Sequence, residues 1–183
     1  MFIQTEQTPN PSTLKFLPGR VVMEKGTMDF ADVDAAQSSP LAKRLFAVEG
    51  VERIFLGADF VTVTKAATGE WQMLKPAILG GIMEHYTSGE PVIAGEASAV
   101  EDAADDDDEI VAQIKDLLET RVRPAVAQDG GDIIFQDFRD GVVYLHMQGS
   151  CSGCPSSTAT LKMGIENLLK HYVPEVVEVQ AAL

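Results

Sequence analysis

The order of hydrophobic and polar positions predicts two structured regions separated by a stretch that has no apolar period. In the first region, residues 1–88, alternating runs predict short strands, and apolar residues three or four apart predict helices. The expected strands are residues 2–5, 13–17, 51–56 and 60–64, and the expected helices begin at Pro40 and Trp71. This mixture predicts a small α+β domain.

The second region, residues 109–183, is predicted to have the order α-β-β-α-β. Apolar spacing predicts a first helix over residues 110–122. Pro124 either kinks this helix or starts a shorter turn after it, and Gly130-Gly131 ends the helical segment. Strands follow at residues 132–138 and 142–147 around an Asp-Gly turn. The expected second helix, residues 158–172, turns Leu161, Ile165, Leu168 and Tyr172 inward, and a last strand contains Val176, Val177 and Val179. The predicted fold class is therefore α+β, with two small domains.

The intervening residues, 89–108, are predicted to form an acidic flexible linker. Residues 89–109 contain nine acidic and no basic side chains, so −9 of the net charge of −14 lies there. Mutual repulsion of these carboxylates favours an extended chain, and those nearest residue 109 suit the start of a helix. The flanking regions are nearly balanced and show no basic stripe, so nucleic acid is not an expected partner.

The chain shows no sign of membrane insertion or of targeting. It contains no run of about 18 apolar residues, and its first residues resemble neither a signal peptide nor a transit peptide. We therefore expect no membrane partner and a cytoplasmic location in a bacterium, or the mitochondrial matrix if the chain is a trimmed mature form. A structural disulfide is not expected in such reducing compartments.

The candidate chemistry lies in residues 149–157, GSCSGCPSS, which contain the two cysteines of the chain, Cys151 and Cys154. This spacing brings two thiolates within reach of one metal centre, whereas a tetrahedral iron or zinc site needs about four ligands. Pro155 suits the first turn of a helix, whose amino-terminal end stabilises thiolates. Because only glycine and serine surround the pair, we expect an exposed loop.

Four interpretations of the cysteine pair compete. A structural zinc site lacks two further ligands at zinc-finger spacing, since His146 lies in a predicted strand and His171 is distant. A thioredoxin-like thiol–disulfide protein is the alternative function, although a hairpin precedes the pair and the proline follows it. Two buried inert cysteines fit poorly with glycine and serine neighbours. The fourth interpretation is an iron–sulfur cluster shared by two chains.

Several segments resemble a known family of two-domain proteins. Residues 109–183 resemble the carboxy-terminal domain of the NifU family, or Nfu domain, in QDGGD at 128–132, in the cysteine segment at 149–157 and in TLKMGIE at 160–166. Residues 1–88 resemble the amino-terminal Nfu domain in QTPNPSTLKF at 7–16 and LKPAI at 74–78. The resemblance covers nearly all of the chain except the linker.

This resemblance implies a carrier rather than an enzyme, and no catalytic residue. It implies that a [4Fe–4S] cluster is received from an upstream donor and delivered to apo iron–sulfur proteins. Cys151 and Cys154 match the family's ligands, and two subunits each supply two thiolates, so cluster binding implies a homodimer. The amino-terminal domain is implied to hold no metal ligand. The Asp-Gly-Gly segment at 129–131 is expected to be a packing turn near the cysteine loop.

Overall fold

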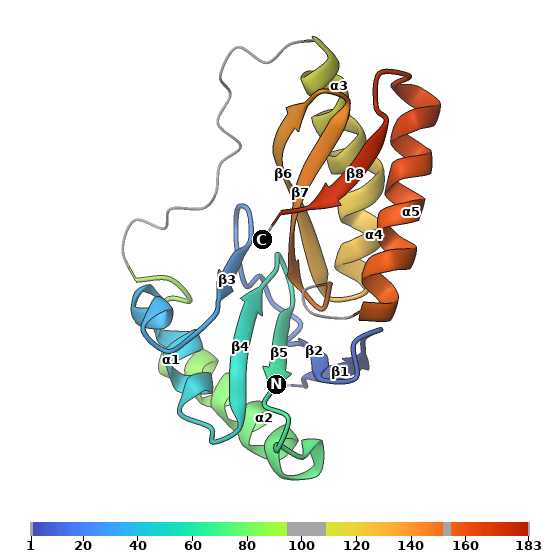
Figure 1. Cartoon of the computed structure of the whole chain (residues 1–183). Helices are drawn as coiled ribbons and strands as arrows, with labels where there is room; N and C mark the ends of the chain where they lie inside the picture. Colours follow the sequence, from blue (N-terminus) through green and yellow to red (C-terminus); the bar gives the residue numbers. More distant parts are fainter. Residues whose placement is uncertain (1, 95–108, 152–154, 183) are drawn as a thin grey trace. The chain divides into compact units, whose positions relative to one another are not determined.

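The computed structural model describes residues 2–94, 109–151 and 155–182. The chain divides into two compact units, residues 1–101 and 102–183, and each unit has its own buried core. Both units combine helices with strands, which confirms the predicted α+β class with two domains (Figure 1). Among the described residues, no helix is both long enough and apolar enough to span a bilayer.

Unit 1 is a five-stranded antiparallel sheet with helices packed against one of its faces. Its strands lie in the spatial order β1-β2-β5-β4-β3. They are β1 Gln4–Gln7, β2 Thr13–Leu17, β3 Met28–Phe30, β4 Val51–Leu56 and β5 Val61–Lys65. The helices are η1 Ala35–Ser38, α1 Pro40–Phe46 and α2 Trp71–Ser88. Sequence patterns missed β3, because three residues are too few to show an alternation.

The pleat of the strands decides which side chains meet the helices. Alternate residues of a strand point to the same face, so β2, β4 and β5 each present apolar residues two positions apart to α1 and α2. The shared core contains Leu14, Phe16, Ile54, Leu56, Val61 and Val63 from the strands, and Leu41, Leu45, Leu74, Ile78 and Ile82 from the helices. Helix α1 begins where the sequence predicts, because the Ser39 hydroxyl accepts a hydrogen bond from the Ala42 N–H at 3.1 Å.

The residues that follow α2 are hydrogen-bonded to the segment before α1 in the same unit. Gly89 ends the helix with a φ of 75°, a conformation that glycine adopts without strain. The Ser39 hydroxyl donates to the Val92 carbonyl at 2.7 Å, and the Ala94 N–H donates to the Ser38 carbonyl at 2.8 Å. The remainder of the predicted linker, residues 95–108, lies outside the described residues.

Unit 2 is a three-stranded sheet, β6-β7-β8, with its helices packed on one face (Figure 1). Its elements are α3 Glu109–Leu117, the π-helical η2 Leu118–Val122, α4 Arg123–Gln128, β6 Gly131–Arg139, β7 Val142–Gly149, α5 Pro155–Tyr172 and β8 Glu178–Ala181. Strands β6 and β7 form an antiparallel hairpin, and β8 lies parallel to β7. The α-β-β-α-β order is confirmed, and Pro124 lies in the first turn of a new helix rather than in a kink.

Two predictions about unit 2 are wrong. Tyr172 is exposed, and Leu169 is fully buried instead, because Leu169 follows Ile165 by four residues and shares its face of α5. The last strand begins later than predicted, because β8 starts at Glu178, so Val176 and Val177 precede it and Val179 lies within it.

The core of unit 1 contains a histidine whose ring is not hydrogen-bonded. His85 on α2 is fully buried, and neither of its ring nitrogens has a hydrogen-bond partner among the described residues. Burial lowers the pKa of His85 below its ordinary value of 6.5, the nearby Arg44 cation lowers it further, and Glu90 opposes them. The folded unit therefore favours the neutral imidazole.

We expect unit 1 to lose stability as the pH falls below about 6.5, where unfolded His85 takes up a proton and the folded ring resists it. Above this pH the ring is neutral in both states and makes no pH-dependent contribution. Urea unfolding followed by the fluorescence of Trp71, the one tryptophan, measures this loss between pH 7 and 5. His85→Leu should flatten the dependence, and His171→Leu, in unit 2, should leave it unchanged. Equal slopes in all three proteins would contradict the prediction.

Candidate metal centre

The structure places the first of the two predicted ligands in the core of unit 2. Cys151 lies two residues beyond the end of β7, is only 7% exposed and belongs to the buried apolar cluster. The expectation of an exposed loop is therefore wrong for Cys151, whose side chain packs into the unit despite its small polar neighbours. Cys154 lies outside the described residues, and α5 begins at the next position, Pro155.

Cys151 lies against the start of strand β6. Gly131 pairs with Gly149 across the hairpin, and its Cα faces the cysteine. A Cβ atom at Gly131 would lie 2.6 Å from the Cys151 Sγ, 2.9 Å from the Gln148 carbonyl oxygen and 3.2 Å from the Cys151 nitrogen. The first two distances are shorter than real Cβ atoms show, and the second is to a backbone carbonyl oxygen, which cannot move aside as a flexible side chain can. The thiol therefore reaches its position only because residue 131 has no side chain.

Two hydrogen bonds hold the cysteine segment to the turn before β6. The Ser150 hydroxyl donates to the Asp129 carbonyl at 2.5 Å, and the Ser150 N–H donates to the Gly130 carbonyl at 3.2 Å. Gly130 has a φ of 79°, which favours glycine and sends the chain from α4 into β6. The prediction that the Asp-Gly-Gly segment is a packing turn near the loop is confirmed.

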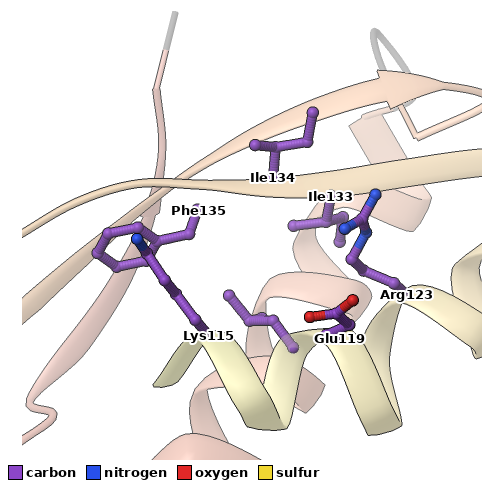
Figure 2. A pocket seen from close by; sticks show the side chains of 7 residues that line it. Lys115, Glu119, Arg123, Ile133, Ile134 and Phe135 are labelled. Carbon is purple, nitrogen blue, oxygen red and sulfur yellow. The ribbon is translucent and has the colours of Figure 1, made fainter. Parts of the chain in front are cut away.

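A part-buried ion pair joins α4 to β6, the two elements on either side of this turn. Arg123, at the start of α4, donates from Nε and Nη2 to the two carboxylate oxygens of Asp132, both at 2.9 Å. Asp132 also accepts the Ile133 N–H at 2.8 Å. Figure 2 shows Arg123 rising from the helix toward β6, beside a small pocket that Glu119 and Ile133 also line. Sequence analysis missed this pair, because a spacing of nine residues has no helical or strand period.

The described part of the chain does not complete a metal site by itself. Among the described residues there is no group of three or more histidine, cysteine, aspartate or glutamate side chains placed to hold a metal ion. His146 lies on β7 and His171 lies near the end of α5, and neither joins such a group. Cys151 is therefore the one predicted ligand that the structure positions.

Comparison with known proteins shows to which family the chain belongs. Residues 3–89 match the family described as "Scaffold protein Nfu/NifU N terminal", and residues 114–180 match the "NifU-like domain". The Homo sapiens protein named "NFU1 iron-sulfur cluster scaffold homolog, mitochondrial" is 52% identical over 184 residues, which cover 100% of this chain and 72% of that protein. This chain belongs to the Nfu/NifU scaffold family. The resemblance predicted from its sequence motifs is confirmed.

Two further relatives extend the comparison of this Nfu/NifU chain. "NifU-like protein 4, mitochondrial" of Arabidopsis thaliana is 56% identical over 181 residues, which cover 96% of this chain but 64% of that protein. The solution NMR structure of a NifU-like protein from Saccharomyces cerevisiae is 29% identical, with a TM-score of 0.48. That match covers 52% of this chain and 87% of the yeast chain.

We expect Gly131→Ala to disrupt the packing around the Cys151 side chain. The added methyl group would meet the Sγ and a backbone carbonyl, and overpacking of this kind costs about 1–3 kcal/mol. Hydrogen exchange of the β6 and β7 amides should accelerate accordingly. Gly164→Ala is the matched control, because nothing lies within 4 Å of a Cβ at that helical position, and it should not accelerate exchange. Unchanged exchange in Gly131→Ala would contradict the close approach.

Asp132→Asn should destabilise unit 2 by about 2 kcal/mol, because a neutral amide replaces the carboxylate that accepts the two charge-assisted hydrogen bonds from Arg123. The pair is part-buried, since the Asp132 side chain is 5% exposed and the Arg123 side chain 27%. Urea unfolding followed by circular dichroism measures the change. Asp137→Asn is the control, because the ion pair of Asp137 with Arg139 is exposed and should be worth less than about 0.5 kcal/mol. Equal losses in the two variants would contradict the assignment.

Proposed function

We propose that this chain is an iron–sulfur cluster carrier that holds a [4Fe–4S] cluster between two copies of itself and delivers it to apo-proteins. Its membership of the Nfu/NifU scaffold family supports the scaffold role, and the human relative is named as an iron–sulfur cluster scaffold homolog. The cluster is cargo rather than a resident cofactor, so the chain acts as a carrier and not as an enzyme.

This proposal rests on the number of cysteine thiolates that one chain can supply. The chain has two cysteines, whereas a [4Fe–4S] cluster takes about four thiolate ligands. Among the described residues, no group of three or more histidine, cysteine or carboxylate side chains is placed to hold a metal ion. A second copy provides the two missing thiolates. Cluster binding and dimer formation are therefore coupled, because the complete ligand set exists only in the dimer.

The position of Cys151 suits both the holding and the release of cargo. Its Sγ lies at the end of β7, held in place by the close contact with Gly131 and by the two Ser150 hydrogen bonds. Helix α5 begins immediately after Cys154, and its amino-terminal end favours thiolate over thiol at the adjacent ligand. Delivery requires only that thiolates of the recipient protein replace these thiolates on iron, and the displaced cysteines can then take up protons.

The alternative function, a thioredoxin-like thiol–disulfide protein, has less support. The β6–β7 hairpin precedes the cysteine pair, whereas the thioredoxin motif follows a strand of a βαβ unit. The proline of this chain, Pro155, follows the pair rather than lying within it. No contact of the described residues favours redox turnover over metal binding.

The relatives also suggest where the carrier works and what it meets. The human and Arabidopsis proteins are both named as mitochondrial, so we place this carrier in the mitochondrial matrix rather than in a bacterial cytoplasm. Its partners are an upstream cluster donor and apo iron–sulfur recipients. Unit 1 has its own core and contains no cysteine, so we assign to it partner recognition rather than cluster binding.

Anaerobic reconstitution with iron and sulfide tests the proposal. The wild-type chain should gain broad visible absorbance and about two irons per chain, and it should sediment as a dimer only when loaded. Cys151→Ala and Cys154→Ala should each fold but fail to retain iron and sulfide. His146→Ala is the control and should retain the cluster. A cysteine variant with full iron content would refute the ligand assignment, and disulfide reductase activity without metal would favour the alternative.

A further inference from the structure

Helix α5 presents an uncharged exposed face next to the cysteine pair. The helix runs from Pro155 to Tyr172, so its first turns follow Cys154 directly. At 3.6 residues per turn, five exposed residues in its first half share one side. They are Ala159, Thr160, Met163, Gly164 and Asn167. Met163 is the most prominent of them, because 66% of its surface is exposed although it is a large apolar residue.

The charged residues beside this face are neutralised within unit 2. Lys162 Nζ lies 3.6 Å from a carboxylate oxygen of Glu178 on β8, and Lys170 Nζ lies 2.6 Å from a carboxylate oxygen of Glu166. The five residues of the face are themselves uncharged. Most of the excess negative charge of the chain lies in residues 89–109, so two copies of unit 2 can approach through this face with little repulsion.

Gly164 leaves the same face without a side chain near its centre. It lies inside an 18-residue helix, where glycine is a poor helix former. It does not have a positive φ, and nothing in its own chain lies within 4 Å of where a Cβ would be. The packing of unit 2 therefore does not require glycine at this position. A missing side chain at an exposed helical position instead permits the close approach of another backbone.

We propose that this α5 face packs side by side against the same face of a second copy, with the two helices roughly parallel. This inference rests on the proposed bridged cluster and names the surface that supports it. A two-fold axis running alongside the helices brings their amino-terminal ends together, so both cysteine pairs meet at one end of the contact. Exposed residues follow one another on this face at intervals of three or four, at Thr160, Met163 or Gly164, and Asn167. This is the spacing of the contact positions between two helices packed side by side.

Opposite charges at residue 163 provide the test in the full-length chain. With two-fold packing, Met163 lies opposite Met163 of the second copy, so Met163→Glu and Met163→Lys should each raise the dissociation constant of the loaded dimer by about tenfold or more. An equimolar mixture of the two variants should restore dimer formation and cluster content, because opposite charges then face each other. Sedimentation and iron counting after anaerobic reconstitution measure both quantities.

Two controls separate this effect from general damage. Met73→Glu places the same charge on an exposed methionine of unit 1, 76% exposed, and should leave the loaded dimer unchanged. Gly164→Leu should weaken the dimer, whereas Gly80→Leu should not, although Gly80 on α2 also has open space at its Cβ position.

Each outcome decides the proposal. Normal dimers and clusters in Met163→Glu would overturn the interface, and normal clusters with slow transfer to an apo-protein would assign the face to recipients instead. A mixture that fails to restore the dimer would rule out the two-fold contact. A wild-type chain that holds a full cluster as a monomer would overturn the bridged function and this interface together.

Discussion

The close approach of strand β6 to Cys151 is the contact on which the arrangement of the metal centre depends. It requires residue 131 to lack a side chain, because a Cβ there would meet both the thiol and two backbone atoms. The Cys151 side chain is thereby positioned against the main chain of the β6–β7 hairpin. In the proposed carrier, a ligand positioned in this way needs little ordering when the cluster binds.

The surrounding contacts maintain this approach. The forked Arg123–Asp132 pair joins α4 to β6, and the turn between these elements accepts the two hydrogen bonds from Ser150. These contacts couple the position of Cys151 to the packing of α4 and β6. The same unit provides α5, which begins next to the second cysteine.

The distribution of charge agrees with a carrier that meets other proteins briefly. Most of the negative charge lies in residues 89–109, and residues 1–88 and 110–183 are nearly neutral. Long-range repulsion between copies is then weakest where the units themselves meet, and it falls further in salt because exposed charges are screened. Unit 1 contributes no cysteine and differs from unit 2 in sheet order, so the two units are built for different contacts.

The sequence by itself determined most of the elements, their order and the spacing of the two cysteines. Alternation, helical spacing, the Ser39 cap and the glycine stops are local signals, and a thiolate pair two residues apart is a local signal as well. Only the tertiary structure decided that Cys151 is buried, that Gly131 lies against its sulfur and that Arg123 pairs with Asp132. It also decided that Leu169 rather than Tyr172 completes the core. These features are contacts between residues brought together by a turn or by packing, and no period along the chain encodes them.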